Sequence, residues 1–252
     1  MGLFRIFDLH VLVVAVLALG ATWLCLTQGI DADLPFELIA IAVVFPTAFA
    51  IGAAHRRREE ALDALATIRA GLASIHWAHR DWPANGAQLG PQSRALCVRV
   101  YDAVCRALAC RASDRATMCV DASSAFSELA VSIEKLKAHG VSGSEVSRAN
   151  QFLNQAVRAF ERLRSIADYR TSDSLRSFCK LFLNVLPVLF APFYAHIANE
   201  ADNAWIGYGV ALGFSLVLVG LDNVQDGLEN PFDGLGVDDV KLDDEADLFW
   251  LR

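Results

Sequence analysis

Residues 34–82 read LPFELIAIAVVFPTAFAIGAAHRRREEALDALATIRAGLASIHWAHRDW, and this stretch decides the fold. Its first part, residues 34–54, is almost entirely apolar and long enough to cross the hydrocarbon of a bilayer. Charged residues follow at 55–60, and beyond them apolar side chains recur every three or four positions, at Leu62, Leu65, Ile68, Leu72 and Ile75. That period is typical of one face of a helix. The stretch therefore predicts one long helix that crosses a membrane and continues beyond it.

Three further stretches, residues 9–27, 178–197 and 204–221, are also apolar and long enough to span a bilayer. The first does not resemble a removable signal peptide, because Trp23 and Leu26 stand where a cleavage site needs small residues. Of the 252 residues 54% are hydrophobic and 20% charged, with a mean hydropathy of +0.35. A soluble domain carries roughly 25% charged residues. We therefore expect four transmembrane helices.

The distribution of charge predicts the orientation of these spans. The connections 28–33 and 198–203 are short and acidic. The opposite ends of the spans carry the basic residues: Arg5, Arg56, Arg57, Arg58, Arg170, Arg176 and Lys180. Since cytoplasmic segments carry the excess of Lys and Arg, we expect a multi-pass protein of the cell inner (plasma) membrane with both termini in the cytoplasm.

The chain divides into four parts: residues 1–54 with the first two spans, 55–177 as a cytoplasmic helical region, 178–221 with the last two spans, and 222–252 as a turn and acidic tail. After a loop at 83–91, apolar stripes predict amphipathic helices over 93–111, 115–139 and about 144–167. Ser142 or Ser144 can cap the last of them. The prediction is an all-α membrane protein with a cytoplasmic helical bundle.

Charge and motifs exclude several function classes. A net charge of −7 and a pI near 5.3 argue against nucleic acid as a partner, which would require a basic face. No phosphate-cradling loop, metalloprotease motif or nucleophile elbow occurs, so we expect neither an enzyme nor a cofactor. His76 and His79 lie three residues apart without an obvious third ligand, which favours packing over metal binding.

The six cysteines form no CxxC pair and are interpreted as free thiols in a reducing cytoplasm. An acidic tail closes the chain and lacks the ligand-glycine-ligand rhythm of an EF-hand, so a solvated tail is favoured over a Ca²⁺ site. Its acidic residues are Asp238, Asp239, Asp243, Asp244, Glu245 and Asp247.

The second span carries the main candidate for a functional site. Ile41, Phe45 and Phe49 lie four residues apart on one helix face, beside Pro46, which we expect to bend the helix. Periodicity alone favours packing against lipid or other helices. The alternative is that several subunits surround an axis, in which case these residues form apolar rings that gate by dewetting.

Two segments resemble the bestrophin family of ion channels. The Ile-Phe-Phe series at four-residue steps, followed by His55-Arg56-Arg57-Arg58-Glu59-Glu60, resembles the family's pore neck and the stretch that enters the cytosol. Glu229-Asn230-Pro231-Phe232, followed by Leu242-Asp243, is similar to the turn and acidic tail of bacterial members, and Leu186-Pro187 resembles a Leu-Pro in the third span. Departures are the arginines and glutamates in place of the family's aromatic pair, and the Gly234–Val237 insertion before the acids, which argues against Ca²⁺ gating.

The resemblance implies a homopentamer in the lipid bilayer that conducts small inorganic ions. By resemblance Ile41, Phe45 and Phe49 form the neck, Ile166 a cytoplasmic aperture, and Arg56, Arg57 and Arg58 charge the vestibule. Chloride or another anion is slightly favoured. A monovalent cation is the alternative, because acidic outer connections would attract cations to the mouth of the pore. The rival prediction is a non-conducting membrane scaffold or sensor that recruits a cytoplasmic partner, and a weaker one is a membrane enzyme with an unrecognised site.

Overall fold

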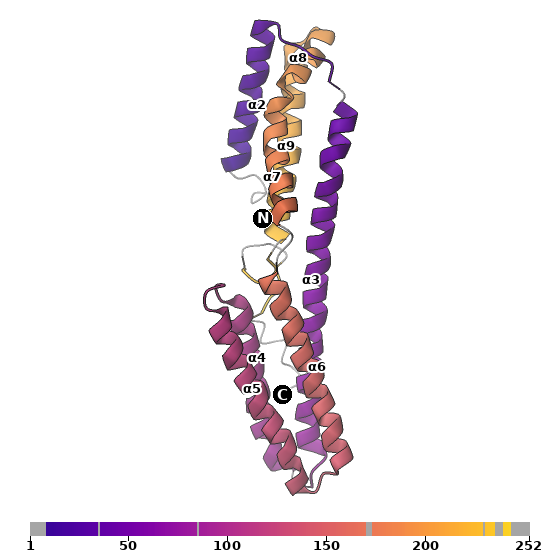
Figure 1. Cartoon of the computed structure of the whole chain (residues 1–252), viewed down its shortest axis with the longest axis vertical. Helices are drawn as coiled ribbons and strands as arrows, with labels where there is room; N and C mark the ends of the chain where they lie inside the picture. The colour runs from indigo at the N-terminus through magenta and orange to yellow at the C-terminus, as the bar shows by residue number, and fades with distance from the viewer. Residues whose placement is uncertain are drawn as a thin grey trace. The chain divides into compact units, whose positions relative to one another are not determined.

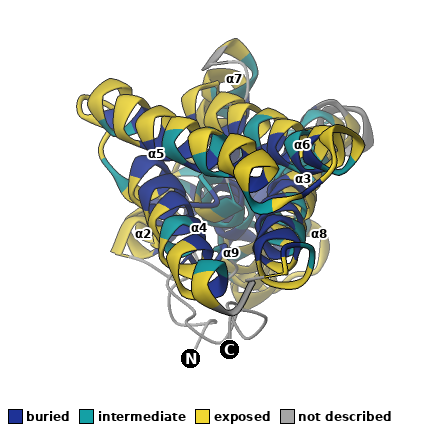
Figure 2. Ribbon diagram, turned by 90° about the horizontal axis from the view of Figure 1, so that it is seen from below, coloured by how far each residue is buried: buried dark blue, intermediate teal, exposed yellow. Residues whose placement is uncertain are grey.

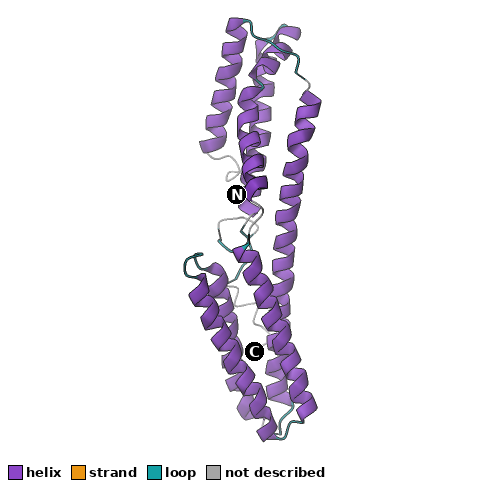
Figure 3. Ribbon diagram, viewed as in Figure 1, coloured by secondary structure: helices purple, strands orange, loops and turns teal. Residues whose placement is uncertain are grey.

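The structure, a computed structural model, describes residues 9–34, 36–84, 86–169, 173–228, 230–234 and 239–242. Every regular element in these residues is a helix (Figure 3), as the sequence predicted. The chain forms two compact units. Unit 1 is built from Met1–Arg56 and Thr171–Glu229, and unit 2 from Arg57–Arg170 and Asn230–Arg252.

Unit 1 contains α2 (Leu9–Gln28), the first part of α3 (Phe36–Asp81), α7 (Asp173–Leu189), α8 (Ala191–Glu200) and α9 (Ala204–Leu228) (Figure 1). Among the described residues three segments are long and apolar enough to cross a membrane: Leu9–Gln28, Ser174–Glu200 and Ala204–Leu228. These are the first, third and fourth predicted spans. The second lies within α3, but several of its first side chains are outside the described residues, so its crossing stays a prediction.

The third and fourth spans differ in detail from their predicted bounds. The third is two helices, α7 and α8, with a break at Phe190. Pro187 lies within α7 and Pro192 begins α8, and because proline has no N–H to donate, the backbone ladder is interrupted between them. The fourth extends seven residues beyond its predicted end, to Leu228, so part of the segment assigned to the tail is helix.

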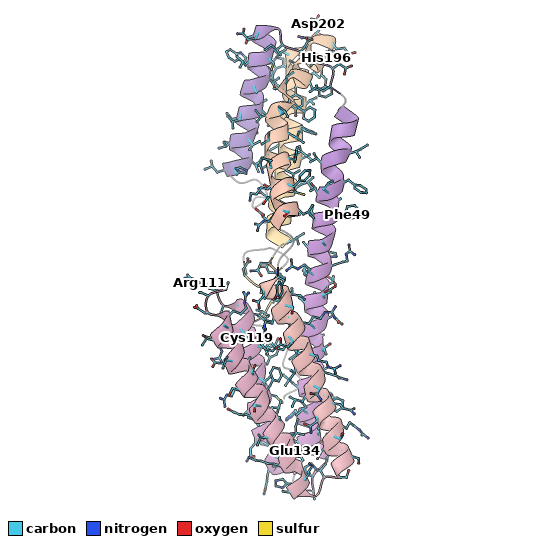
Figure 4. All side chains as sticks on the ribbon, viewed as in Figure 1. Phe49, Arg111, Cys119, Glu134, His196 and Asp202 are labelled. Carbon is cyan, nitrogen blue, oxygen red and sulfur yellow. The ribbon has the colours of Figure 1, made fainter. Side chains whose placement is uncertain are left out.

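The two acidic connections between helices, residues 28–33 and 198–203, lie at the same end of unit 1. The backbone N–H of Ala32 donates to Pro192 O (3.3 Å), and Asn199 Nδ2 donates to Asp31 Oδ2 (3.3 Å). His196, labelled in Figure 4, places Nδ1 3.7 Å from the same carboxylate. These contacts place the two connections together, which the topology prediction requires.

Unit 2 contains the rest of α3, then α4 (Gly86–Ala109), α5 (Arg115–Lys135), the short 3₁₀ helix η1 (Leu136–His139) and α6 (Gly143–Asp168). Each helix buries one face, as Figure 2 shows for α4 and α5, and the predicted α3 stripe from Leu65 to Ile75 lies in the shared core. The predicted long helix is therefore confirmed: α3 continues without a break for 46 residues.

Two local predictions in unit 2 had different outcomes. The loop predicted at 83–91 is shorter, because α4 begins at Gly86 and continues around Pro91, which removes one hydrogen bond near the helix start without ending the helix. The cap prediction is confirmed at Ser142, whose hydroxyl accepts from the Glu145 N–H while the Glu145 carboxylate accepts from the Ser142 N–H. Gly140, with φ +85°, ends the preceding helix.

Candidate functional site: an apolar face of α3 and a polar network

The first part of α3 has two opposite faces within unit 1. Val43, Thr47, Ala50 and Ala54 are buried at steps of four, three and four residues, and Val43 and Ala50 pack in the core formed with α7, α8 and α9. The predicted neck residues are exposed: Ile41 by 63%, Phe45 by 62% and Phe49 by 56%. At about 100° per residue the centres of the two faces are about 170° apart.

The exposed face is aromatic as well as apolar. The rings of Phe45 and Phe49 meet edge to face with their centroids 4.7 Å apart. Figure 4 shows Phe49 pointing outward from α3. Edge-to-face contact fixes the relative orientation of neighbouring rings, so this face presents an ordered apolar surface for lipid, a neighbouring subunit or a water-filled path.

The three predicted vestibule arginines have different surroundings. Arg56 is exposed and its Nε donates to Gly52 O (3.4 Å). Arg58 pairs with Glu59 (2.8 Å). Arg57 Nη2 donates to Ile166 O (2.8 Å) and Tyr169 O (2.5 Å), which are carbonyls at the end of α6. The last carbonyls of a helix lack partners within the helix, so Arg57 caps α6.

A second arginine, which sequence reasoning missed, reinforces that cap. Arg115 is buried and its Nη1 donates to Ala167 O (2.9 Å) and to Asp168 Oδ1 (2.8 Å). The predicted aperture residue Ile166 lies beside these groups and is only 8% exposed, in the core of unit 2. A residue that forms a constriction has to face the ion path, whereas the Ile166 side chain is buried within the single subunit. Its role as the cytoplasmic aperture therefore stays a prediction.

A polar network joins α2, α7 and α9 at the end of unit 1 where α2 begins. His10 Nε2–H donates to Asn184 Oδ1 (2.6 Å), and Asn184 Nδ2 donates to Asp222 Oδ2 (2.8 Å). One turn away, Lys180 Nζ and Arg176 Nη2 donate to the two carboxylate oxygens of Asp226, at 2.8 and 3.0 Å. Sequence reasoning treated these residues only as span ends and tail.

In the sequence, the only sign of this network is that its polar residues are spaced four apart on two helices. Arg176, Lys180 and Asn184 lie on one face of α7, and Asp222 and Asp226 on one face of α9. Asp222 and the neighbouring Gln225 are buried, and Gln225 Oε1 has no hydrogen-bond partner. Buried ionisable groups at a membrane span are costly and are by default functional candidates.

Both histidines of the pair are hydrogen-bonded within the chain. His76 Nδ1 lies 2.9 Å from Ser93 Oγ, and His79 Nδ1 lies 2.9 Å from Ile75 O. Burial, with the charges of Arg80, His79 and Arg94, lowers the pKa of His76 below its ordinary value of 6.5. Among the described residues no three His, Cys, Asp or Glu side chains gather as a metal site.

The C-terminal segment returns to unit 2. Phe232 and Leu242 are buried in its core, the Val240 N–H donates to Pro231 O (2.8 Å), and the Cys105 thiol donates to Leu242 O (3.4 Å). The Pro-Phe turn therefore packs as part of unit 2. Several residues of the sequence analysis lie outside the described residues: Arg5, Arg170, Glu229, Asp238, Asp243, Asp244, Glu245 and Asp247.

The described residues thus define an all-helical membrane protein with one exposed aromatic face on a long helix. No family model and no curated protein matches the sequence. A solved structure of the bacterial bestrophin homologue from Klebsiella pneumoniae superposes with a TM-score of 0.78 at 16% identity, covering 99% of this chain and 95% of that one. A variant of that homologue gives 0.78 at 15% identity with the same coverage.

A further solved structure, described as a membrane protein, gives a TM-score of 0.77 at 16% identity, again over 99% of this chain and 95% of that one. The resemblance inferred from two short segments is confirmed over nearly the whole chain, as a shared fold. The fold of this protein is that of bacterial bestrophin homologues. Because fold does not determine function, its activity has to be argued from the α3 face and the network.

Proposed function

We propose that the protein is a pentameric, bestrophin-like channel in which α3 lines a central pore. The observation that carries the proposal is the orientation of α3. Val43, Thr47, Ala50 and Ala54 pack inward, and the aromatic face of α3 is left uncovered by the subunit. In this arrangement Ile41, Phe45 and Phe49 from each subunit form three stacked apolar rings around the axis, and a neck of this kind controls ion passage by dewetting.

The proposed arrangement has four spans with both termini in the cytoplasm. The two acidic connections lie together and the basic residues of α7 lie at the opposite end of unit 1. The positive-inside rule assigns that opposite end to the cytoplasm. Unit 2 is then cytoplasmic and supplies the walls of a vestibule, and the membrane is the plasma membrane.

We favour anions such as chloride over monovalent cations. Arg56 is exposed directly after the neck, whereas Arg57 is committed to capping α6 and Arg58 to Glu59. Arg56 is therefore the residue of this cluster best placed to raise the local anion concentration. Asp31 at the outer end faces His196 and Asn199, so part of its charge is met locally.

The polar network has a positioning role in this proposal. It ties α2, α7 and α9 at the cytoplasmic end through two neighbouring carboxylates, three donors on α7 and His10. The hydrogen-bonded carboxylates and cations offset one another's desolvation. This arrangement holds the three helices as one block, against which α3 packs through Val43 and Ala50.

Flux through liposomes tests the proposal. The neck variant replaces Ile41, Phe45 and Phe49 by Ala, and it is expected to raise chloride flux several-fold because smaller side chains widen and wet the constriction. The matched control replaces Leu12, Val16 and Leu17 of α2 by Ala. These are 62%, 58% and 56% exposed, so exposed apolar side chains, smaller than those of the neck, are removed from a helix outside the proposed pore.

The control variant should conduct like the unmodified protein. No chloride or sodium flux from either the unmodified protein or the neck variant contradicts the channel and favours a non-conducting scaffold. Equal changes in the two triple variants contradict the assignment of α3 as the pore wall.

A further inference from the structure

A groove in unit 2 lies apart from the α3 face and from the polar network. It is lined mainly by residues of α4 and α5, which lie side by side (Figure 1), and by His79 of α3. Its volume is about 410 Å³, within the range of roughly 300–1,000 Å³ that is typical of small-molecule sites. The residues of its lining that matter below are His79, Leu89, Leu96, Glu128, Ser132 and Lys135.

His79 presents a hydrogen-bond acceptor to this groove. The side chain is only 4% exposed, and its Nδ1 must carry the proton because it faces a carbonyl, Ile75 O, which can only accept. In the neutral ring Nε2 then has a lone pair. Its neighbour is Ser132 Oγ at 3.3 Å, whose own hydrogen is directed to Leu129 O at 2.7 Å. Because one hydroxyl hydrogen cannot fully serve both Leu129 O and His79 Nε2, a ligand N–H would give the imidazole nitrogen a donor of its own.

A cation lies one helical turn from Ser132 on α5. Lys135 lines the groove three residues after Ser132, and side chains at this spacing are neighbours on a helix. Glu128 also lines the groove but is paired with Arg99 (2.5 Å). The charge that remains for a ligand is therefore the Lys135 ammonium, which attracts a carboxylate.

Another part of the groove lining is apolar. Leu89 and Leu96 of α4 face it from one side and Val131 and Leu136 from the other. The groove therefore offers an N–H acceptor, a cation and an apolar wall, beside the polar side chains of Gln92, Ser93, Ser127 and His139. We propose that it binds a small zwitterion, a free α-amino acid with an apolar side chain. Its ammonium donates to His79 Nε2 and Ser132 Oγ, its carboxylate accepts from Lys135, and its side chain lies against the leucines.

Calorimetric titration of the full chain in detergent tests the site with L-leucine and two analogues. Isoamylamine is leucine without the carboxylate, and 4-methylpentanoate is leucine without the ammonium. Leucine should bind, and each analogue should bind about tenfold more weakly or worse, which corresponds to about 1.4 kcal/mol. Lys135→Gln should weaken leucine to the level of isoamylamine. Lys137→Gln is the matched control, because that lysine pairs with Glu134 and does not line the groove.

His79→Phe keeps an aromatic ring without the lone pair and should also lose leucine binding. If that variant does not fold, the weaker binding of 4-methylpentanoate carries the same information about the ammonium. The proposal is overturned if leucine does not bind at millimolar concentration, which is also the result if a neighbouring subunit covers the groove. It is equally overturned if Lys135→Gln binds leucine as the unmodified protein does, or if either analogue binds as tightly as leucine. The readout is binding, so the outcome is independent of conduction.

Discussion

Replacing Gly207 by Ala should destabilise unit 1, because α9 passes close to α8 at this residue. A Cβ at Gly207 would lie 2.6 Å from Tyr194 O and 2.8 Å from Ala198 Cβ. Ordinary van der Waals contact begins at 3.4 Å, so the first contact is too short by 0.8 Å (3.4 minus 2.6). The crowded atom is a backbone carbonyl, which cannot rotate away, so the helices have to move apart.

The expected magnitude is the difference of two effects. Overpacking costs about 1–3 kcal/mol, and a backbone obstacle indicates the upper end of that range. Ala is better than Gly in a helix by about 1 kcal/mol. The net loss in the free energy of unfolding is therefore about 2 kcal/mol, a fall in Tm of about 4–8 °C for a chain of this size.

Gly213 on the same helix provides the matched control. A Cβ there has open space within 4 Å, so Gly213→Ala retains only the favourable helix term and should raise Tm by about 2–4 °C. Thermal unfolding in detergent, followed by intrinsic tryptophan fluorescence, measures both variants. A Tm for Gly207→Ala equal to or above that of Gly213→Ala would refute the close packing of α8 and α9.

Three further predictions concern charged groups. Arg57→Gln should lower the free energy of unfolding, measured by chemical denaturation, by about 2 kcal/mol, because two charge-assisted hydrogen bonds to the end of α6 are lost. Arg56 is exposed, so Arg56→Gln should change that free energy by less than about 0.5 kcal/mol. Equal effects of the two substitutions would contradict the capping role of Arg57. Asp226→Asn should lower Tm modestly, since two cations of α7 lose their counter-charge, and an unchanged Tm argues against the network. Burial lowers the pKa of His76, so below about pH 6.5 the unfolded chain binds a proton that the folded chain does not. Stability should fall as pH falls from 6.5, and His76→Gln should flatten that dependence; a parallel pH profile for both proteins would contradict it.

The features that the sequence predicted are those set by long-range periodicity. The apolar run of 34–54 and the stripe from Leu62 to Ile75 were sufficient to predict the uninterrupted α3, because both parts follow a helical period and neither contains a helix-ending signal strong enough to separate them. The same periodicity placed Ile41, Phe45 and Phe49 on one face. It could not show which face the subunit buries, which depends on Val43 and Ala50 packing against other helices.

The features that the sequence missed depend on contacts between distant segments. Asn184 and Asp222 are 38 residues apart, and His10 and Asn184 are 174 apart. No local pattern marks such pairs as partners. Arg57 was assigned to a vestibule by the family resemblance. Its two acceptors lie at the end of α6, more than 100 residues away in the chain, so its capping role is visible only in the structure.

The most direct test of the central claim is a density map of the protein in lipid nanodiscs by single-particle cryo-electron microscopy. We expect five copies around one axis, with Phe45 and Phe49 of each α3 facing that axis and Val43 and Ala50 facing away from it. A monomer or dimer, or a ring in which the phenylalanine face meets lipid, would contradict it.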